Sequence, residues 1–149
     1  MGADLFIATE TAVPTIDLQI ESGALEACDA MDRVAVRLGV RPLLSFLSAD
    51  PAATEELFEM SDLEPPTDGF PPEEWFAAAE GLITVRALLA ALRADPEPTA
   101  EEASGPPDPA KPWQWRPDAE ELTGELEQIE DVLQQLASAG VRWHLDVST

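Results

Sequence analysis

Residue types that often carry redox or nucleophilic chemistry are scarce in this chain. Its 149 residues include one cysteine, one histidine and no tyrosine. A single cysteine, Cys28, forms no internal disulfide and makes no multi-cysteine zinc site, so we expect a reducing, cytoplasmic setting. The sequence has no calcium-loop spacing, phosphate-binding glycine loop or nucleophile elbow. We therefore expect no metal and no cofactor.

Basic residues and long apolar runs are also rare. The chain has eight Lys plus Arg against thirty Asp plus Glu, and its formal net charge is −22. Nucleic acids and anionic membrane surfaces both select basic patches, so neither is an expected partner. The longest apolar run, 81–92, is interrupted by Arg86 and is shorter than the roughly 18 residues of a membrane span. The N-terminus lacks the basic region of a secretory signal.

The acidic residues are unevenly distributed along the sequence. Residues 47–75 contain nine acids and no base, whereas residues 76–94 contain one acid and two bases. The nearly neutral stretch 76–94 is also the most apolar, which indicates a central core helix. Since 45% of the chain is hydrophobic, it has enough apolar material for a folded core.

Local patterns predict both strands and helices. Short apolar or alternating stretches predict strands at 5–8, 16–20 and 141–147. Helical spacing predicts helices over 22–38, from 51 to about 60, over 72–94, and from 118 to the glycine at 140. Seven of the fourteen prolines lie in 95–117, which predicts an extended segment there. The expected fold is a single small α+β domain over 1–149. Its short antiparallel or mixed sheet, formed by the N- and C-terminal strands, is packed by three to four helices.

The apolar positions of these helices predict which side chains pack within the fold. They are Cys28 in the first helix, Leu57, Phe58 and Met60 in the second, and Leu122, Leu126, Ile129, Leu133 and Leu136 in the last. In the helix over 72–94 the predicted seam is Leu82, Val85, Leu89 and Leu92, widened by Ile83 and Leu88. Trp75 and Phe76 are expected to anchor that helix against the sheet, and a binding groove lined by their rings is the alternative.

Several sequence stretches carry a resemblance to other proteins. They are the N-terminal MGA, 38–43 (LGVRPL), 72–76 (PEEWF), 81–89 (GLITVRALL) and 141–145 (VRWHL). In this order they resemble a group of small uncharacterised bacterial proteins. The resemblance implies a shared small fold and assigns no activity and no site residues.

One candidate site lies on the last predicted strand. Arg142, His144 and Asp146 alternate with apolar residues and so share one face. A histidine beside a carboxylate can act as a general base, and an arginine can hold an anionic substrate. A solvated strand face explains the same pattern without any chemistry.

Two further stretches are candidates for binding a partner. Trp113, Trp115 and Arg116 lie between prolines, where they form either a strap over this domain or a contact for a partner. Glu55, Glu56 and the nearby Glu59 belong to the acid-rich stretch, which is either a solvated surface or a mimic of a phosphate backbone.

These features favour a non-enzymatic domain that binds a protein with a basic surface. An inhibitor or immunity protein for a basic toxin or nuclease is the most concrete form of this hypothesis. The first alternative is a small-molecule binder or enzyme that uses the polar strand face. The second is a structural protein whose charge serves solubility alone. The sequence does not predict an oligomeric state.

Overall fold

The two ends of the chain pair with each other. The structure is a computed structural model that describes residues 4–16, 18, 24–62, 64–65, 67, 69–106, 109–112 and 116–148. In it β1 (Asp4–Thr9) runs antiparallel to β2 (Trp143–Ser148), with Ile7 opposite Leu145. This pairing confirms the predicted strands at 5–8 and 141–147, and it confirms that they are neighbours.

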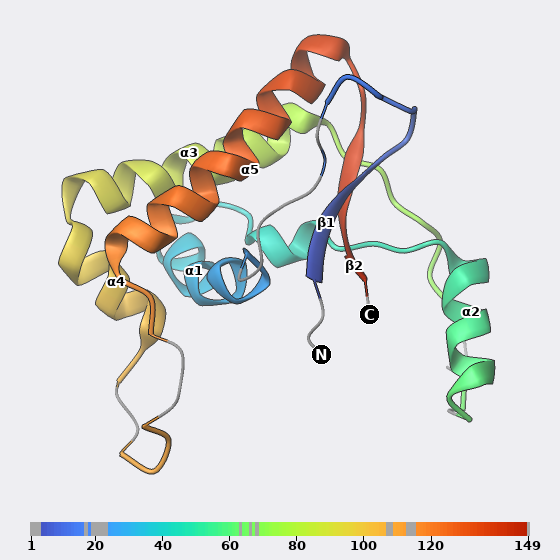
Figure 1. Cartoon of the computed structure of the whole chain (residues 1–149), viewed down its shortest axis with the longest axis horizontal. Helices are drawn as coiled ribbons and strands as arrows, with labels where there is room; N and C mark the ends of the chain where they lie inside the picture. Colours follow the sequence, from blue (N-terminus) through green and yellow to red (C-terminus); the bar gives the residue numbers. More distant parts are fainter. Residues whose placement is uncertain are drawn as a thin grey trace.

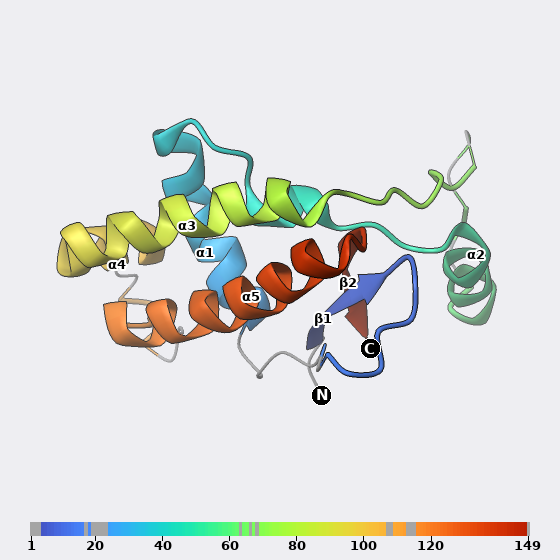
Figure 2. The ribbon, with the colours of Figure 1, turned by 90° about the horizontal axis from the view of Figure 1, so that it is seen from above.

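Helices occupy most of the chain between the two strands. In the described residues these are α1 (Ala24–Leu38), the 3₁₀ helix η1 (Leu43–Phe46), α2 (Pro51–Met60), α3 (Ala78–Ala94), α4 (Pro96–Ser104) and α5 (Ala119–Ala139). Together with the two-stranded sheet they form the expected small single-domain α+β arrangement. In both views α3 and α5 lie side by side, whereas α2 stands apart at the opposite end of the molecule (Figures 1 and 2).

Two helices begin and one ends where the sequence predicts. Asp50 accepts a hydrogen bond from the Ala52 N–H at 3.0 Å and so caps α2. Asp118 caps α5 in the same way, accepting from the Glu121 N–H at 2.8 Å. Gly140, with φ of 69°, ends α5 in the left-handed conformation that glycine adopts readily.

The core is built from the predicted apolar stripes. The five predicted stripe residues of α5 are fully buried: Leu122, Leu126, Ile129, Leu133 and Leu136. The α3 seam of Leu82, Val85, Leu89 and Leu92 is also buried. The prediction that Ile83 widens this seam is wrong, because its side chain is 64% exposed. None of the helices within the described part of the chain is long and apolar enough to cross a membrane.

Helix α1 contributes buried side chains and a carboxylate that orders the next turn. Cys28 is fully buried, as predicted for a core residue, and burial raises the pKa of its thiol. Asp32 accepts hydrogen bonds from the backbone N–H groups of Leu43 and Leu44 at 2.8 and 3.3 Å. These bonds satisfy donors at the start of η1. Burial of Asp32 raises its pKa although the two hydrogen bonds act in the opposite direction.

The prediction of an extended segment throughout 95–117 is wrong for its first part. Helix α4 forms there because Pro96 and Pro98 occupy its first turn, where the missing N–H groups would have no helical partner. The helix then buries Thr99, Ala100 and Ala103. It is the additional helix that the sequence patterns did not predict.

Two further predictions need correction. Ile16 and Leu18 lie in no strand, and residues 17, 19 and 20 lie outside the described residues. Both side chains pack against the core without belonging to a strand. Helix α3 begins at Ala78 and not near 72, because Phe76, two residues before it, pairs with β2 through its backbone.

Candidate functional site

The stretch with nine acids and no base leaves the body and returns to it at a single strand. We call residues 47–75 the acidic arm. At its start Leu47 bridges Leu145, and immediately after its end Phe76 bridges Trp143. The Phe76 N–H donates to the Trp143 carbonyl at 2.8 Å, and the Trp143 N–H returns a bond of 2.9 Å. Strand β2 therefore lies between β1 on one side and the two ends of the arm on the other.

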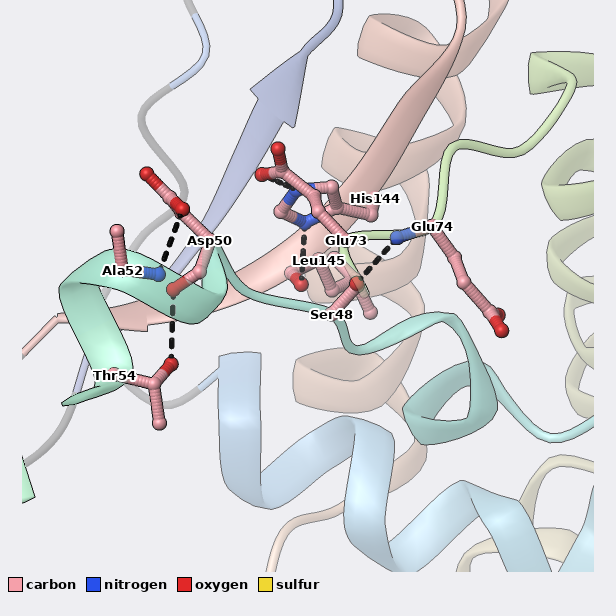
Figure 3. A network of polar contacts seen from close by, with 8 residues as sticks. All are labelled: Ser48, Asp50, Ala52, Thr54, Glu73, Glu74, His144 and Leu145. Carbon is pink, nitrogen blue, oxygen red and sulfur yellow. Dashed lines mark hydrogen bonds and ion pairs between the residues drawn. The ribbon is translucent and has the colours of Figure 1, made fainter. Parts of the chain in front are cut away.

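Hydrogen bonds also connect the two ends of the arm to each other (Figure 3). The Ser48 N–H donates to the Leu145 carbonyl at 3.0 Å. The Ser48 hydroxyl accepts a bond of 2.8 Å from the Glu74 N–H, on the returning segment. The base of the arm is therefore fixed to the body through backbone groups.

His144 lies beneath the returning segment of the arm. Its side chain is fully buried, with Nε2 at 2.9 Å from a carboxylate oxygen of Glu73 and Nδ1 at 3.0 Å from the Leu145 carbonyl. Both ring nitrogens face acceptor oxygens, so each contact is a hydrogen bond when that nitrogen carries a proton. The ring of Trp75 covers the imidazole at a centroid distance of 4.6 Å. This geometry holds the arm against β2.

The opposite face of β2 is fixed by an aromatic cluster. Trp143 is fully buried, stacks on Phe46 at 5.0 Å and donates from Nε1 to the Ala77 carbonyl at 3.2 Å. Phe76 meets Phe46 edge to face at 5.2 Å. The Cα of Gly81 lies so close to this cluster that an added Cβ would be 2.4 Å from Trp143 Cζ2. The predicted anchoring role of Phe76 is thus visible in its contacts.

Helix α2 contacts the other residues of the arm through one stripe of half-buried side chains. Pro51, Thr54 and Phe58 are half-buried, and the other residues of the helix are exposed. Phe58 packs edge to face on Phe70 at 5.0 Å. No side chain of α2 is fully buried, so the helix contributes little to the hydrophobic core.

A different stripe of α2 is apolar and open to solvent. Leu57 is 53% exposed and Met60 is 78% exposed. The sequence pattern suggested that these residues pack within the fold, which is wrong. The side chains of Glu55, Glu56 and Glu59 are exposed on the same helix, and none forms an ion pair with another described residue.

A hollow of about 440 Å³ lies at the base of the arm. Its lining residues are apolar, neutral polar and acidic: Leu47, Ser48, Ala49, Thr54, Pro71, Pro72, Glu74 and Asp146. In the described part of the chain no group of three or more His, Cys, Asp or Glu side chains is arranged to hold a metal ion. The two charged lining residues of the hollow are both acidic, which suits positively charged groups.

The structure does not bring the three residues of the predicted polar face together. Arg142 is exposed and forms an ion pair with Glu10 of the segment that follows β1. Asp146 lines the hollow, which includes neither Arg142 nor His144. The interpretation of a solvated strand face is wrong at His144, because Glu73 and Trp75 contact its buried side chain. A catalytic role for the three residues stays a prediction.

The proline-rich candidate surface lies partly outside the described residues. Trp113 and Trp115 are among the residues that are not described, so their predicted contacts cannot be placed. Arg116 is described, and it donates a hydrogen bond to the Gly105 carbonyl at 2.9 Å. This bond joins the two ends of the 105–116 loop.

Sequence reasoning did not find the partners of His144. Glu73 is separated from it by 71 residues, and Trp75 lies two positions further on. The one available signal was PEEWF, a stretch that is both acidic and aromatic. By its local pattern this stretch belongs to the helix predicted over 72–94, and nothing in the pattern indicates that Phe76 pairs with β2.

Comparisons with known proteins add no relationship. No protein-family model, no curated protein and no solved structure matches this chain.

Proposed function

We propose that this protein is a non-enzymatic binding domain whose acidic arm contacts a basic surface of another protein. The observation that carries the proposal is the arm itself. It contains nine acids and no base, and its helix α2 buries no side chain in the body. Three of these acids thus lie on a helix that the core does not need.

The physical advantage of this arrangement is that the arm and a basic partner associate quickly and selectively. An acidic element attracts a basic surface over a distance of about 10 Å at moderate salt, and it repels acidic competitors. Fixing the base of the arm to β2 holds the charges in a defined place, which lowers the ordering cost of binding. An inhibitor or immunity protein for a basic toxin or nuclease is the most concrete form of the proposal. Its proposed setting is the cytoplasm, in keeping with the single thiol.

The test compares two variants that each remove three negative charges. The arm variant is Glu55→Gln, Glu56→Gln and Glu59→Gln. The control variant is Glu80→Gln, Glu101→Gln and Glu120→Gln, whose side chains are also exposed but lie on α3, α4 and α5. The full chain serves as bait in extracts of the native host, and the recovered partner is purified for titration.

We expect the partner to bind the full chain more weakly as salt rises from 0.05 to 0.5 M. Exposed charge pairs contribute about 0.2–1 kcal/mol each, so the arm variant should lose roughly tenfold in affinity. The control variant should lose less, since its charges lie farther from the contact. Failure to recover a partner would overturn the proposal. So would a partner whose affinity is the same at low and high salt and the same for the full chain and both variants.

A further inference from the structure

The exposed stripe of α2 has the spacing of a docking helix. Ala53, Leu57 and Met60 follow at i, i+4 and i+7, so they project from one face. This is the spacing with which amphipathic helices enter an apolar groove of a partner. All three residues are exposed, and the half-buried stripe of α2 lies on another side. Within the described part of the chain, no segment therefore covers this face.

Two of the three glutamates of α2 lie toward one edge of this stripe. With about 100° between successive residues, Glu56 lies roughly 60° from the stripe and Glu59 roughly 120°. The half-buried residues Thr54 and Phe58 lie on the opposite side, toward the rest of the arm. A partner that covers the stripe therefore meets negative charge along one rim of its groove. Lysine or arginine residues on that rim complement it.

Helix α2 is also formed and fixed in place before a partner binds. An isolated helix of ten residues is marginal in water. Here the Asp50 cap stabilises its first turn, and the Thr54 hydroxyl donates to the Asp50 carbonyl at 3.0 Å (Figure 3). The contact between Phe58 and Phe70 fixes its other half. A partner thus meets a formed helix and does not have to order it.

From these observations we infer that α2 docks into an apolar groove of a basic partner protein. Leu57 and Met60 enter the groove, and Glu56 and Glu59 pair with lysine or arginine residues on its rim. This inference rests on the proposed function and adds an apolar contact that charge attraction alone does not require.

The test removes the apolar anchors without changing charge. The docking variant is Leu57→Ala and Met60→Ala, and alanine keeps the helix propensity of α2. The matched control is Val36→Ala and Ile83→Ala, whose side chains are 68% and 64% exposed on α1 and α3. The probes are the purified partner recovered with the full chain and poly-L-lysine, a polycation without an apolar groove. Circular dichroism checks that each variant keeps its helices.

We expect the docking variant to bind the partner roughly tenfold to a hundredfold more weakly, as for buried anchors in other interfaces. Its binding to poly-L-lysine should not change, and the control variant should bind both probes like the wild type. If the docking variant binds the partner normally while the Glu→Gln arm variant does not, the inference is wrong and the proposed function stands. Equal losses in the docking and control variants also overturn the inference. Recovery of no partner overturns both.

Discussion

The contact between Gly81 and Trp143 makes a sharp prediction about the strand that anchors the arm. In Gly81→Ala the new Cβ would lie 2.4 Å from Trp143 Cζ2 and 2.9 Å from Leu133 Cδ1. Carbon atoms in good contact are about 3.5–4.0 Å apart, so the indole ring would have to move by roughly 1 Å. That movement is resisted by the stacking on Phe46 and by the hydrogen bond to the Ala77 carbonyl.

Two opposing terms determine the expected change in the free energy of unfolding. Replacing glycine by alanine within a helix favours folding by about 1 kcal/mol. Overpacking a well-filled core costs about 1–3 kcal/mol, and the fixed ring of Trp143 places this site at the upper end. We therefore expect Gly81→Ala to be less stable than the wild type by about 2 kcal/mol.

Gly124→Ala is the matched control, because this glycine lies on α5 with nothing within 4 Å of an added Cβ. Only helix propensity changes there, so the free energy of unfolding of this variant should be about 1 kcal/mol higher than that of the wild type. Urea unfolding followed by circular dichroism measures both changes, with equal m-values expected. If Gly81→Ala proves as stable as Gly124→Ala, the close packing of α3 on β2 is refuted.

Two further predictions concern buried polar side chains. His144→Ala removes a fully buried ring and leaves the Glu73 carboxylate without its partner. We therefore expect the free energy of unfolding, measured with urea, to fall by about 3 kcal/mol. The neighbouring Arg142→Ala breaks only an exposed ion pair and should change stability by less than about 1 kcal/mol; equal losses would contradict the burial of His144. Cys28 should not react with a thiol reagent at pH 8 in the folded protein, because burial raises its pKa and blocks access. In urea it should react fully, and rapid reaction of the folded protein would show that α1 is not packed as described.

Patterns local to the sequence predicted the elements whose burial repeats along one face. The five apolar residues of α5 follow helical spacing and are all buried, and Asp118 and Gly140 mark its two ends. Such features depend on a side chain and its own backbone within a few residues. The same local reasoning went wrong at Pro96 and Pro98, because the density of prolines obscured their favourable position in the first turn of α4.

For the candidate site, the sequence predicted the ingredients but not their arrangement. It showed that Glu55, Glu56 and Glu59 lie in a stretch without bases, and it placed a short helix there. It also suggested apolar contacts for Leu57 and Met60, which the structure leaves exposed. A helical pattern shows which side chains share a face, but whether another segment covers that face depends on the rest of the chain.

The sequence by itself determined the charge of this protein, the caps and apolar stripes of its main helices, and the two terminal strands. Only the tertiary structure decided that both ends of the acidic arm pair with β2 and that α2 is held away from the core. It also decided that His144 is buried against Glu73, 71 residues away. These outcomes depend on backbone pairing and packing between distant segments, which leave no periodic signal in any local stretch of sequence.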